Sequence, residues 1–395
     1  MADIITILVN GVPFEGWLVF KSHHSFDKAA GTLDLTIAPQ PGKQLPIKIG
    51  DKIQAFVAGT SVLKGNVHDV EGNDDWQHDV RIVHARDQTQ DFIDSTCGPQ
   101  KPVKPPAGLK DILTSHLGNM GLGHIPVIDN VNPEQFRDGE VPVAWIDEFG
   151  HQFGDRLSRQ RQVLLNTDGN GSLVIDRNQG KRGSGALFRA APEDPRNAAN
   201  NILKAHYKYG DLNRHNQHAT NSQHSTNDTD YWEGKPKDYK PAQAGPLSKE
   251  YGVAYDDGVR PERRLHVRAK HSLRRGKTKD ASKWRANVSK GRGFNYKATV
   301  QSFEQTPGKI WWPGLIIPVY DYKYELDGEF LIKDVSFHRD WKGGSMTELT
   351  LTYPDAFSDK DGKGSAKTGR TSSQGAGAPD AQGEAPAGDL EQEEP

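Results

Sequence analysis

The first part of the chain alternates apolar and polar residues in short runs. Between residues 4 and 97 these runs are ITILVNG, WLVFKSH, LDLTIAP, KIQAFVAG, VLKGNVHDVE and HDVRIVHAR, and Gly, Pro, Asn and Asp separate them. A period of two is typical of half-buried strands, and short strands at regular spacing with turn residues between them are typical of a sandwich or barrel. The pattern predicts a first β-domain over residues 1–97.

A helical period follows this region. After Pro105 and Pro106, apolar residues recur at helical spacing at Leu109, Ile112, Leu113, Leu117 and Met120, and Gly121 stands at the C-cap position. A second helix is predicted from Val143 to about Arg159, weakened by Gly150 and Gly154, with apolar positions at Ile146, Phe149, Phe153 and Leu157. The run QVLLNTDGNGSLVIDR then predicts a hairpin. Residues 98–190 are therefore expected to form a small α/β insert domain.

The second half of the chain returns to strands after a polar region. Residues 190–259 are rich in Asn, His, Asp and Lys, and residues 213–245 are expected to form a long exposed loop or a locally disordered segment. A helix is predicted at 278–290. Four alternating runs, FNYKATVQSFEQ, LIIPVYDYKY, GEFLIKDVSFHRD and MTELTLTYPD, then predict a second β-domain over 191–356. From Phe357 to Pro395 almost nothing can be buried, so a disordered acidic tail is expected.

The expected fold is thus mainly β, with two β-domains that bracket a small α/β domain. A length of 395 residues exceeds what one hydrophobic core usually serves, so two to four domains are expected. Cys97 is the single cysteine, which excludes an intramolecular disulfide and a cysteine-cluster metal site and fits a reducing cytoplasm. The N-terminus lacks the pattern of a signal peptide, and no run reaches the ~20 apolar residues of a membrane span.

Charge is balanced in total but not along the chain. The formal net charge is −2, so no overall field favours nucleic acid or an anionic membrane. Residues 260–297, however, are strongly basic and include Trp284, Phe294 and Tyr296, whereas every charged residue beyond Thr371 is acidic. The basic stretch has three interpretations: a nucleic-acid surface, a solvated helix face, or a surface that docks against an acidic neighbouring subunit.

Three groups of residues could carry chemistry, and each has a plainer interpretation. Asn166, Asp168, Asn170 and Gly171 copy the first half of an EF-hand loop, but Arg177 stands at its twelfth position, which favours a hairpin turn over calcium. The second group consists of His206, His215, His218 and His224, which fit no known metal-ligand spacing, so solvated loop histidines are favoured over a metal site.

The third group consists of acidic residues. A glycosidase needs two carboxylates, which could be drawn from Glu134, Asp147 and Glu148. The favoured interpretation is that these residues are exposed, solvated charges. No nucleophile motif surrounds Cys97 or any serine. The sequence therefore assigns no catalytic, cofactor-binding or metal-binding residue, and we expect that the protein is not an enzyme and has no cofactor.

Four segments carry a resemblance to a known family. They are ITILVNGVPFEGW, RIVHARDQTQDFIDST, LSRQRQVLLNTDGNGSLVIDR and KIWWPGLIIPVYD. In their order and spacing, from residue 4 to about 355, they resemble the Mu-type contractile phage baseplate hub proteins. This tail protein P family is related to the late control protein D family and to the hub part of type VI secretion spike proteins. The sequence departs from the family pattern at 213–245 and in the acidic tail.

The resemblance implies a structural role. Both β-domains would be tail-tube-like barrels, and three chains would form a homotrimeric ring around a central channel. The ring would adapt the six-fold tail tube to the three-fold membrane-piercing spike. Implied partners are the spike protein, the tail tube or distal tail protein, baseplate wedge proteins and the tape measure protein, with DNA only as passing cargo and no membrane insertion.

The implied location is the virion tail baseplate, assembled in the host bacterial cytoplasm. Without an OB-domain or β-helix in the sequence, the spike is expected to be a separate protein. Two alternatives to the phage hub stay open: a tail-tip peptidoglycan hydrolase, and the hub of a phage-derived injection particle of the tailocin or type VI kind.

Overall fold

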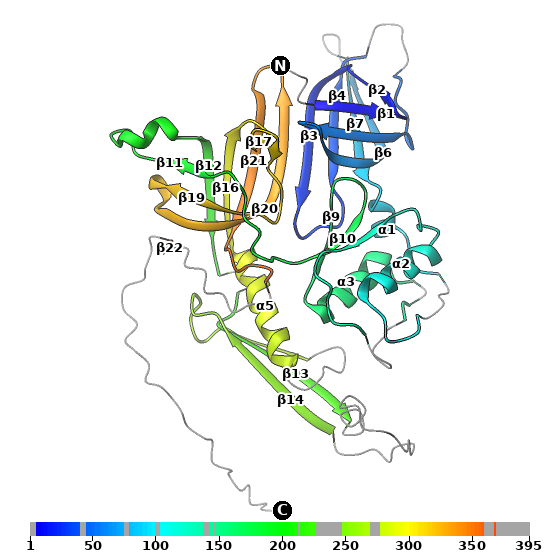
Figure 1. The fold of residues 1–395 in the computed structure, drawn as a ribbon, viewed down its shortest axis with the longest axis vertical. Coiled ribbons are helices and arrows are strands. Elements are labelled where there is room, and N and C mark those ends of the chain that lie inside the picture. Colours follow the sequence, from blue (N-terminus) through cyan, green and yellow to red (C-terminus); the bar gives the residue numbers. More distant parts are fainter. Residues whose placement is uncertain are drawn as a thin grey trace, which may run out of the picture.

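The computed structural model confirms a mainly β protein with few helices. It describes residues 5–39, 45–74, 79–98, 103–136, 143–145, 147–211, 214–225, 247–268, 277–358 and 367–368. Figure 1 shows two β-rich halves side by side at one end of the molecule, helices beneath the first half, and a long helix that leads from the second half to a small separate sheet. Within the described residues, every helix is too short or too polar to cross a membrane.

The first half contains the strands expected from the alternating runs. They are β1 (Ile5–Val9), β2 (Val12–Pro13), β3 (Trp17–Ser25), β4 (Thr32–Ile37), β5 (Lys52–Val57), β6 (Thr60–Asp74) and β7 (Asp79–Asp87). They pair antiparallel in the order β3-β4-β7-β6-β5-β1-β2. Alternate residues point inward because successive side chains of a strand lie on opposite faces, and Leu33, Leu35 and Ile37 are accordingly buried.

The second half contains the four predicted strands and two that the sequence did not indicate. The predicted ones are β16 (Phe294–Gln301), β19 (Ile316–Asp321), β20 (Leu326–Asp340) and β21 (Gly344–Thr352), and the others are β11 (Leu187–Arg189) and β12 (Ile202–Tyr209). A short hairpin of β17 (Glu304–Thr306) and β18 (Lys309–Ile310) lies beside them. In β12 most side chains are exposed, which explains why no alternating apolar pattern marks it.

A single long strand joins the two halves. The first part of β20 pairs with β19, whereas its second part pairs with β3, from Asp334 opposite Ser25 to Arg339 opposite Phe20. The halves therefore form one 14-stranded sheet, and one hydrophobic cluster extends beneath both of them. Two separate closed barrels were expected. Within the described residues, strand pairing closes neither half into a barrel, and β20 pairs with β3 across the two halves.

The insert has a hydrophobic core of its own. It contains α1 (Gln90–Asp94), α2 (Leu109–Asn119), β8 (Val127–Asp129), α3 (Gly150–Arg161), β9 (Leu164–Thr167) and β10 (Leu173–Asp176). The prediction that the second helix starts at Val143 is wrong. The Glu148 N–H donates to the Trp145 carbonyl in a turn, and backbone groups of Glu148 and Gly150 pair with Cys97 and Ser95, so α3 begins only at Gly150.

The polar region forms a third, small sheet. Its strands are β13 (Gln217–Ser225), β14 (Leu247–Tyr255) and β15 (Arg264–Arg268), in the order β14-β13-β15, and α5 (Lys277–Gly293) packs on one face. The helix expected at 278–290 therefore exists as part of α5. The long loop expected at 213–245 is wrong where the structure describes it, because residues 217–225 are a strand. Residues 226–245 lie outside the described residues.

The expected tail begins later than predicted. Phe357 is fully buried against Phe26, Trp284 and Leu331, and Ser358 is also buried, so both belong to the fold. Lys367 and Thr368 form β22, which pairs with the start of β20. The rest of 359–395 lies outside the described residues. The division into domains at 97, 190 and 356 stays a prediction.

Candidate functional site

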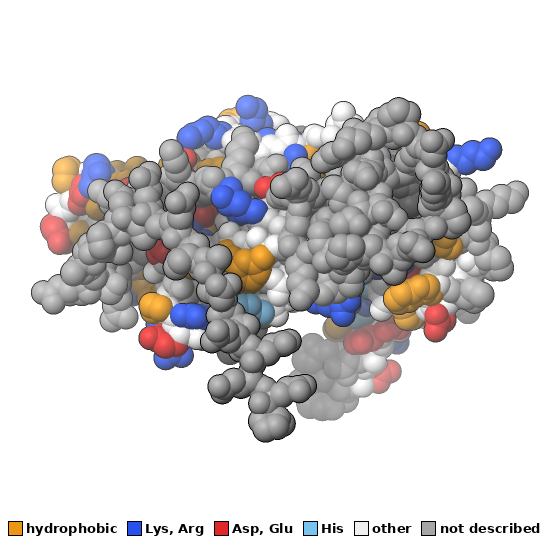
Figure 2. All heavy atoms as spheres, turned by 90° about the horizontal axis from the view of Figure 1, so that it is seen from below, with side chains coloured by type: hydrophobic (Ala, Val, Ile, Leu, Met, Phe, Trp, Pro, Cys, Tyr) orange, Lys and Arg blue, Asp and Glu red, His pale blue; other side chains and the backbone are white. Residues whose placement is uncertain are grey.

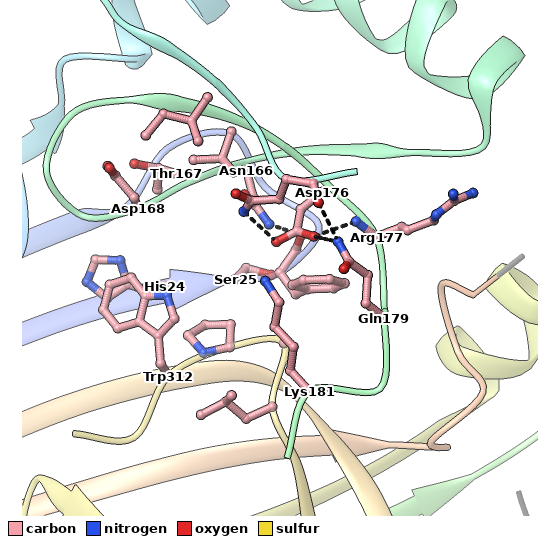
Figure 3. Close-up of a pocket in the computed structure, with 17 residues that line it drawn as sticks. His24, Ser25, Asn166, Thr167, Asp168, Asp176, Arg177, Gln179, Lys181 and Trp312 are labelled. Atoms are coloured by element: carbon pink, nitrogen blue, oxygen red, sulfur yellow. Dashed lines mark hydrogen bonds between the residues drawn. The ribbon is translucent and has the colours of Figure 1, made fainter. Parts of the chain in front are cut away.

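A cavity of ≈ 290 Å³ lies where the three parts of the chain meet. Its wall is built by the end of β3, by the β9–β10 hairpin of the insert with the segment after it, and by the turn at Trp312–Leu315. Figure 3 shows His24 and Trp312 on one side of the cavity, Lys181 reaching toward its middle, and Asp176 held in hydrogen bonds. It is therefore a junction between elements far apart in the sequence.

His24 is a buried neutral group in this wall. Its ring lies 4.8 Å, centroid to centroid, from Trp312, and its Nε2 is 2.9 Å from the Ser22 hydroxyl. Burial lowers the pKa of His24 to about 3, and the neighbouring His23 adds to the effect. Its Nδ1 has no hydrogen-bond partner within the described part of the chain. The imidazole therefore packs like an aromatic side chain at neutral pH.

Asp87 lies close to this junction, at the end of β7. It is 1% exposed, and its Oδ2 accepts a 2.6 Å hydrogen bond from the Thr167 hydroxyl of β9. Burial raises the pKa of Asp87 to about 7, against the opposing effect of the Thr167 hydrogen bond. A shifted pKa often marks a functional group, but this carboxyl is closed off from solvent. The contact therefore fastens the insert to the first half.

The turn between β9 and β10 completes this fastening. Asp168 Oδ1 accepts hydrogen bonds from the backbone N–H groups of Asn170 (2.8 Å) and Ser172 (3.0 Å), which shapes the turn. The carbonyl oxygens of Gly169 and Gly171 accept from Ser61 and Gln88 of the first half. The hairpin predicted from Asn166, Asp168, Asn170 and Gly171 is therefore confirmed, and the Asp168 carboxylate holds the turn.

The cavity rim beyond the hairpin is polar. Asp176 accepts from Asn130 Nδ2 (3.2 Å), from the Arg177 backbone N–H (2.8 Å) and from Gln179 Nε2 (3.4 Å). Asn166 Nδ2 donates to the Phe26 carbonyl at 3.3 Å. These groups bond mainly to one another, so the arrangement positions the insert, β3 and the Trp312 turn relative to each other.

The histidines singled out from the sequence do not come together as a group. His206 is exposed on β12, and the side chain of His224 lies outside the description. The rings of His215 and His218 are 5.7 Å apart. The interpretation as solvated loop histidines is wrong for His218, which is 1% exposed and has its pKa lowered to about 4 by burial and by His215. No three His, Cys, Asp or Glu side chains within the described ranges gather as metal ligands.

The candidate carboxylates also separate. Glu134 and Asp147 are exposed, as expected, but Glu148 is buried, so the prediction of solvated charge is wrong for it. Arg156 holds its carboxylate through Nε (3.1 Å) and Nη2 (2.7 Å), because a buried charge needs a partner. Glu148 is therefore engaged in a structural ion pair.

One buried pair was not visible in the sequence. Cys97 Sγ lies 3.4 Å from His116 Nε2, and both residues are at most 2% exposed. Burial lowers the pKa of His116 to about 4, and the ring packs 4.5 Å from Phe153. The two residues are 19 positions apart on an irregular segment and on α2, so no sequence spacing marks the pair. It lies in the insert core, away from solvent.

The aromatic residues of the basic stretch are buried too. Trp284 is 6% exposed, and Phe294 and Tyr296 are fully buried. The interpretation of these three rings as a stacking surface for nucleic acid is therefore wrong. Tyr296 instead donates a 2.6 Å hydrogen bond to Asp321, which also receives a bidentate contact from Arg189.

Comparison with known proteins connects this fold to phage tails. Residues 275–360 match the family described as Mu phage baseplate assembly protein GpP, fourth domain. The chain resembles the Mu-type baseplate hub proteins. The resemblance stated from the sequence is thus confirmed, and the matched segment runs from α5 through β21 and includes the β20 strand that joins the two halves. A search of curated proteins found no match.

Solved structures show the same fold over nearly the whole chain. The 43 kDa tail protein of prophage MuSo2 from Shewanella oneidensis is 22% identical, with a TM-score of 0.68 over 89% of this chain and 98% of that one. A tail protein from Neisseria meningitidis MC58 is 16% identical, with a TM-score of 0.64 over 88% and 96%. An E. coli component of the type VI secretion system is 11% identical, with a TM-score of 0.53 over 88% and 76%. The fold is that of tail and baseplate hub-like proteins.

Proposed function

We propose that this protein is the structural baseplate hub of a contractile phage tail. Three chains form a ring that adapts the six-fold tail tube to the three-fold spike and encloses a central channel. The match of residues 275–360 to a baseplate domain and the likeness to prophage tail proteins support this role. In this role the protein works through rigid interfaces and cyclic closure, without bond chemistry or a cofactor.

The observation that carries the proposal is the edge-to-edge union of the two β-rich halves through β20 and β3. One chain thereby supplies two wall segments in a fixed relative orientation, so three chains supply six. Among the described strands, the main order of the sheet ends at β2 on one side and at β12 on the other, while β11 and β22 pair outside this order. Open sheet edges present unpaired backbone groups and are suited to pairing between subunits. In the ring, the β2 end of one copy meets the β12 end of the next.

The partners follow from this position. The ring contacts the spike protein on one side and the tail tube or distal tail protein on the other, with baseplate wedge proteins around it. The tape measure protein and later DNA pass through the channel. The protein is assembled in the host cytoplasm and resides in the virion tail.

Light scattering coupled to size exclusion tests the ring. Three chains of 43.7 kDa give 3 × 43.7 = 131 kDa. Leu203, exposed on β12, offers an edge variant, and Leu18, exposed on β3 away from the edges, offers its control. We expect a trimer for the native protein and for Leu18→Lys, and dissociation for Leu203→Lys. A native protein that stays monomeric at high concentration would overturn the proposal.

A second candidate is the hub of a phage-derived injection particle. The likeness to the E. coli type VI secretion component favours it, since the fold extends over 76% of that chain. Capsid genes beside the gene for this protein would indicate a phage, and their absence an injection particle. A zymogram with the native protein and with Asp147→Asn, at an exposed candidate carboxylate, addresses the hydrolase alternative. That alternative requires clearing by the native protein that is lost in the variant.

A further inference from the structure

Among the described residues, α5 packs on one face of the small sheet, and the opposite face, called the open face below, carries exposed side chains. On the covered face, the Ser282 hydroxyl of α5 donates 2.8 Å hydrogen bonds to Thr220 Oγ1 and to the Gly252 carbonyl oxygen. Gly252 lies so close to the backbone of α5 that an added Cβ would be 2.2 Å from the Lys279 nitrogen. Because side chains of a strand alternate between faces, the residues one position away lie on the face opposite α5.

The open face combines aromatic rings with positive charge. Register places Tyr255, Gln217 and Arg264 in one row and Tyr251, Asn221 and Arg268 in another, with His266 beside Ala219 between them. Tyr251 is 55% and Tyr255 65% exposed, and Arg264, His266 and Arg268 are exposed. The Tyr251 ring stacks with the His266 ring at 6.5 Å. In Figure 2, which views the molecule from this end, individual Lys and Arg side chains are visible at several separate places on the described surface, together with hydrophobic and acidic ones.

The chain itself contains a segment of opposite charge. Beyond Thr371 the charged residues are Asp380, Glu384, Asp389, Glu391, Glu393 and Glu394, without any Lys or Arg. Carboxylates recognise arginine through paired, charge-assisted hydrogen bonds, and an Arg beside an aromatic ring is a common peptide-binding combination. The open face and the tail are therefore complementary in charge.

The path of the chain brings this segment within reach. Before the tail, Asn287 Nδ2 of α5 donates to the Ser358 carbonyl at 2.9 Å, and Lys290 bonds Asp355 at 2.7 Å. The last described residue is Thr368 on β22, so 395 − 368 = 27 residues follow it. A fully extended chain of this length reaches about 90 Å, which exceeds the diameter of a domain of about 100 residues.

We propose that the open face of the β13–β14–β15 sheet binds the acidic C-terminal segment, residues 371–395, of the same chain. The carboxylates pair with Arg264 and Arg268, and the segment lies across Tyr251 and Tyr255. A tethered segment has an effective concentration on the order of 1 mM, so a site of modest affinity is occupied. The tail then covers a basic, aromatic surface until a partner with more or better placed acidic groups displaces it.

The test uses the full-length protein with a contact-sensitive dye. A bimane dye on Ala387→Cys is quenched by tyrosine at contact, and the buried Cys97 is replaced by Ser to prevent labelling there. We expect a loss of about half the fluorescence at low salt that is recovered at about 0.5 M NaCl, since salt screens such contacts. Arg264→Glu with Arg268→Glu relieves the quenching, and so does replacing the six tail carboxylates by amides.

A matched control keeps the comparison specific. Arg182→Glu with Lys309→Glu reverses two exposed cations on the segment before β11 and on β18, outside the small sheet, and is expected to leave the quenching unchanged. Equal relief by both pairs of reversals would overturn the proposal, as would an absence of quenching. Quenching that grows with protein concentration would assign the face to the tail of a second copy. If quenching is absent and a single-stranded oligonucleotide binds in a way that depends on Arg264 and Arg268, the open face would be assigned to nucleic acid.

Discussion

Arg214 and Asp256, which are 42 positions apart, form a bidentate ion pair that is almost completely buried. Arg214 Nη2 lies 2.8 Å from both carboxylate oxygens, Nε lies 3.0 Å from Oδ2, and the side chains are 2% and 6% exposed. Arg214 precedes β13 and Asp256 follows β14, while Arg214 Nη1 donates to Tyr209 at the end of β12. The pair thus fixes the small sheet to the second half.

Removal of either Arg214 or Asp256 should lower the stability of the small sheet. We expect Arg214→Ala to destabilise the small sheet by about 3–5 kcal/mol, because Asp256 would keep a buried charge without its cation. Arg263→Ala is the control, since its partner Asp211 is half exposed and solvent screens their ion pair, so its loss should have little effect on stability. Hydrogen exchange of β13–β15 amides is the measurement. Equal protection in both variants would contradict the role of the pair.

Ionisation of Asp87 should lower the free energy of unfolding as the pH rises, whereas most carboxylates have the opposite effect. Its folded pKa of about 7 lies above the ordinary value of 3.8, so the folded state holds the proton more tightly than the unfolded state. The stability it contributes is present below about pH 4 and is lost as pH rises to about 7. The full difference corresponds to about 4 kcal/mol.

The Asp87→Asn variant tests this dependence. An amide keeps an acceptor for the Thr167 hydroxyl but cannot ionise, so the thermal midpoint of the variant should exceed that of the native protein at about pH 8. Near pH 4 the two midpoints should coincide. Asp69→Asn, at an exposed position on β6, is expected to leave the profile unchanged. A native-like profile in Asp87→Asn would show that another group is responsible.

Gly31 and His24 should be energetically coupled. A Cβ at Gly31 would lie 2.7 Å from His24 Cε1 and 2.8 Å from Nδ1, and the ring is confined by Trp312. We expect Gly31→Ala to cost about 1–3 kcal/mol through overpacking. In a His24→Ser background most of this cost should vanish, which a double-mutant cycle by urea unfolding would detect. Gly118→Ala, on α2 with open space around it, is the control and should stabilise the protein by up to about 1 kcal/mol through helix propensity.

The Cys97 thiol should be unreactive in the folded protein. It is 1% exposed and lies against His116 in the core of the insert, so a reagent reaches it only when the insert opens. We expect slow labelling by a thiol reagent in buffer and rapid labelling in denaturant. Thr114→Cys, exposed on α2, should label rapidly in both conditions. Rapid labelling of native Cys97 would mean that this core is open.

Local patterns predicted most of the strands but not how they pair. The run GEFLIKDVSFHRD predicts a strand of the second β-domain, and it does form β20, yet its second part pairs with β3, which lies far away at the start of the chain. Nothing in an alternating pattern specifies the partner of a strand edge. The hairpin at Asp168 was predictable because the Asp168 side chain accepts hydrogen bonds from backbone groups two and four positions further along the chain.

The errors arose where tertiary contacts override local composition. Residues 217–225 are polar, but Thr220 finds its hydrogen bond on α5, so a polar strand can be buried. Phe357 begins a segment rich in Gly, Ser and Asp, yet it packs against Phe26. The junction cavity was not predictable either, since His24, Asp176 and Trp312 are brought together only by the fold.

The pairing of β20 with β3 also has a mechanical consequence. Six successive residue pairs of the antiparallel strands β20 and β3 join the two halves. A pull directed along these strands loads all their hydrogen bonds at once, whereas a pull across them would open the bonds one by one. The β20–β3 pairing therefore resists a force that shears the two strands past each other better than a force that separates them from one end. Forces transmitted through this protein are best resisted when they run along β20.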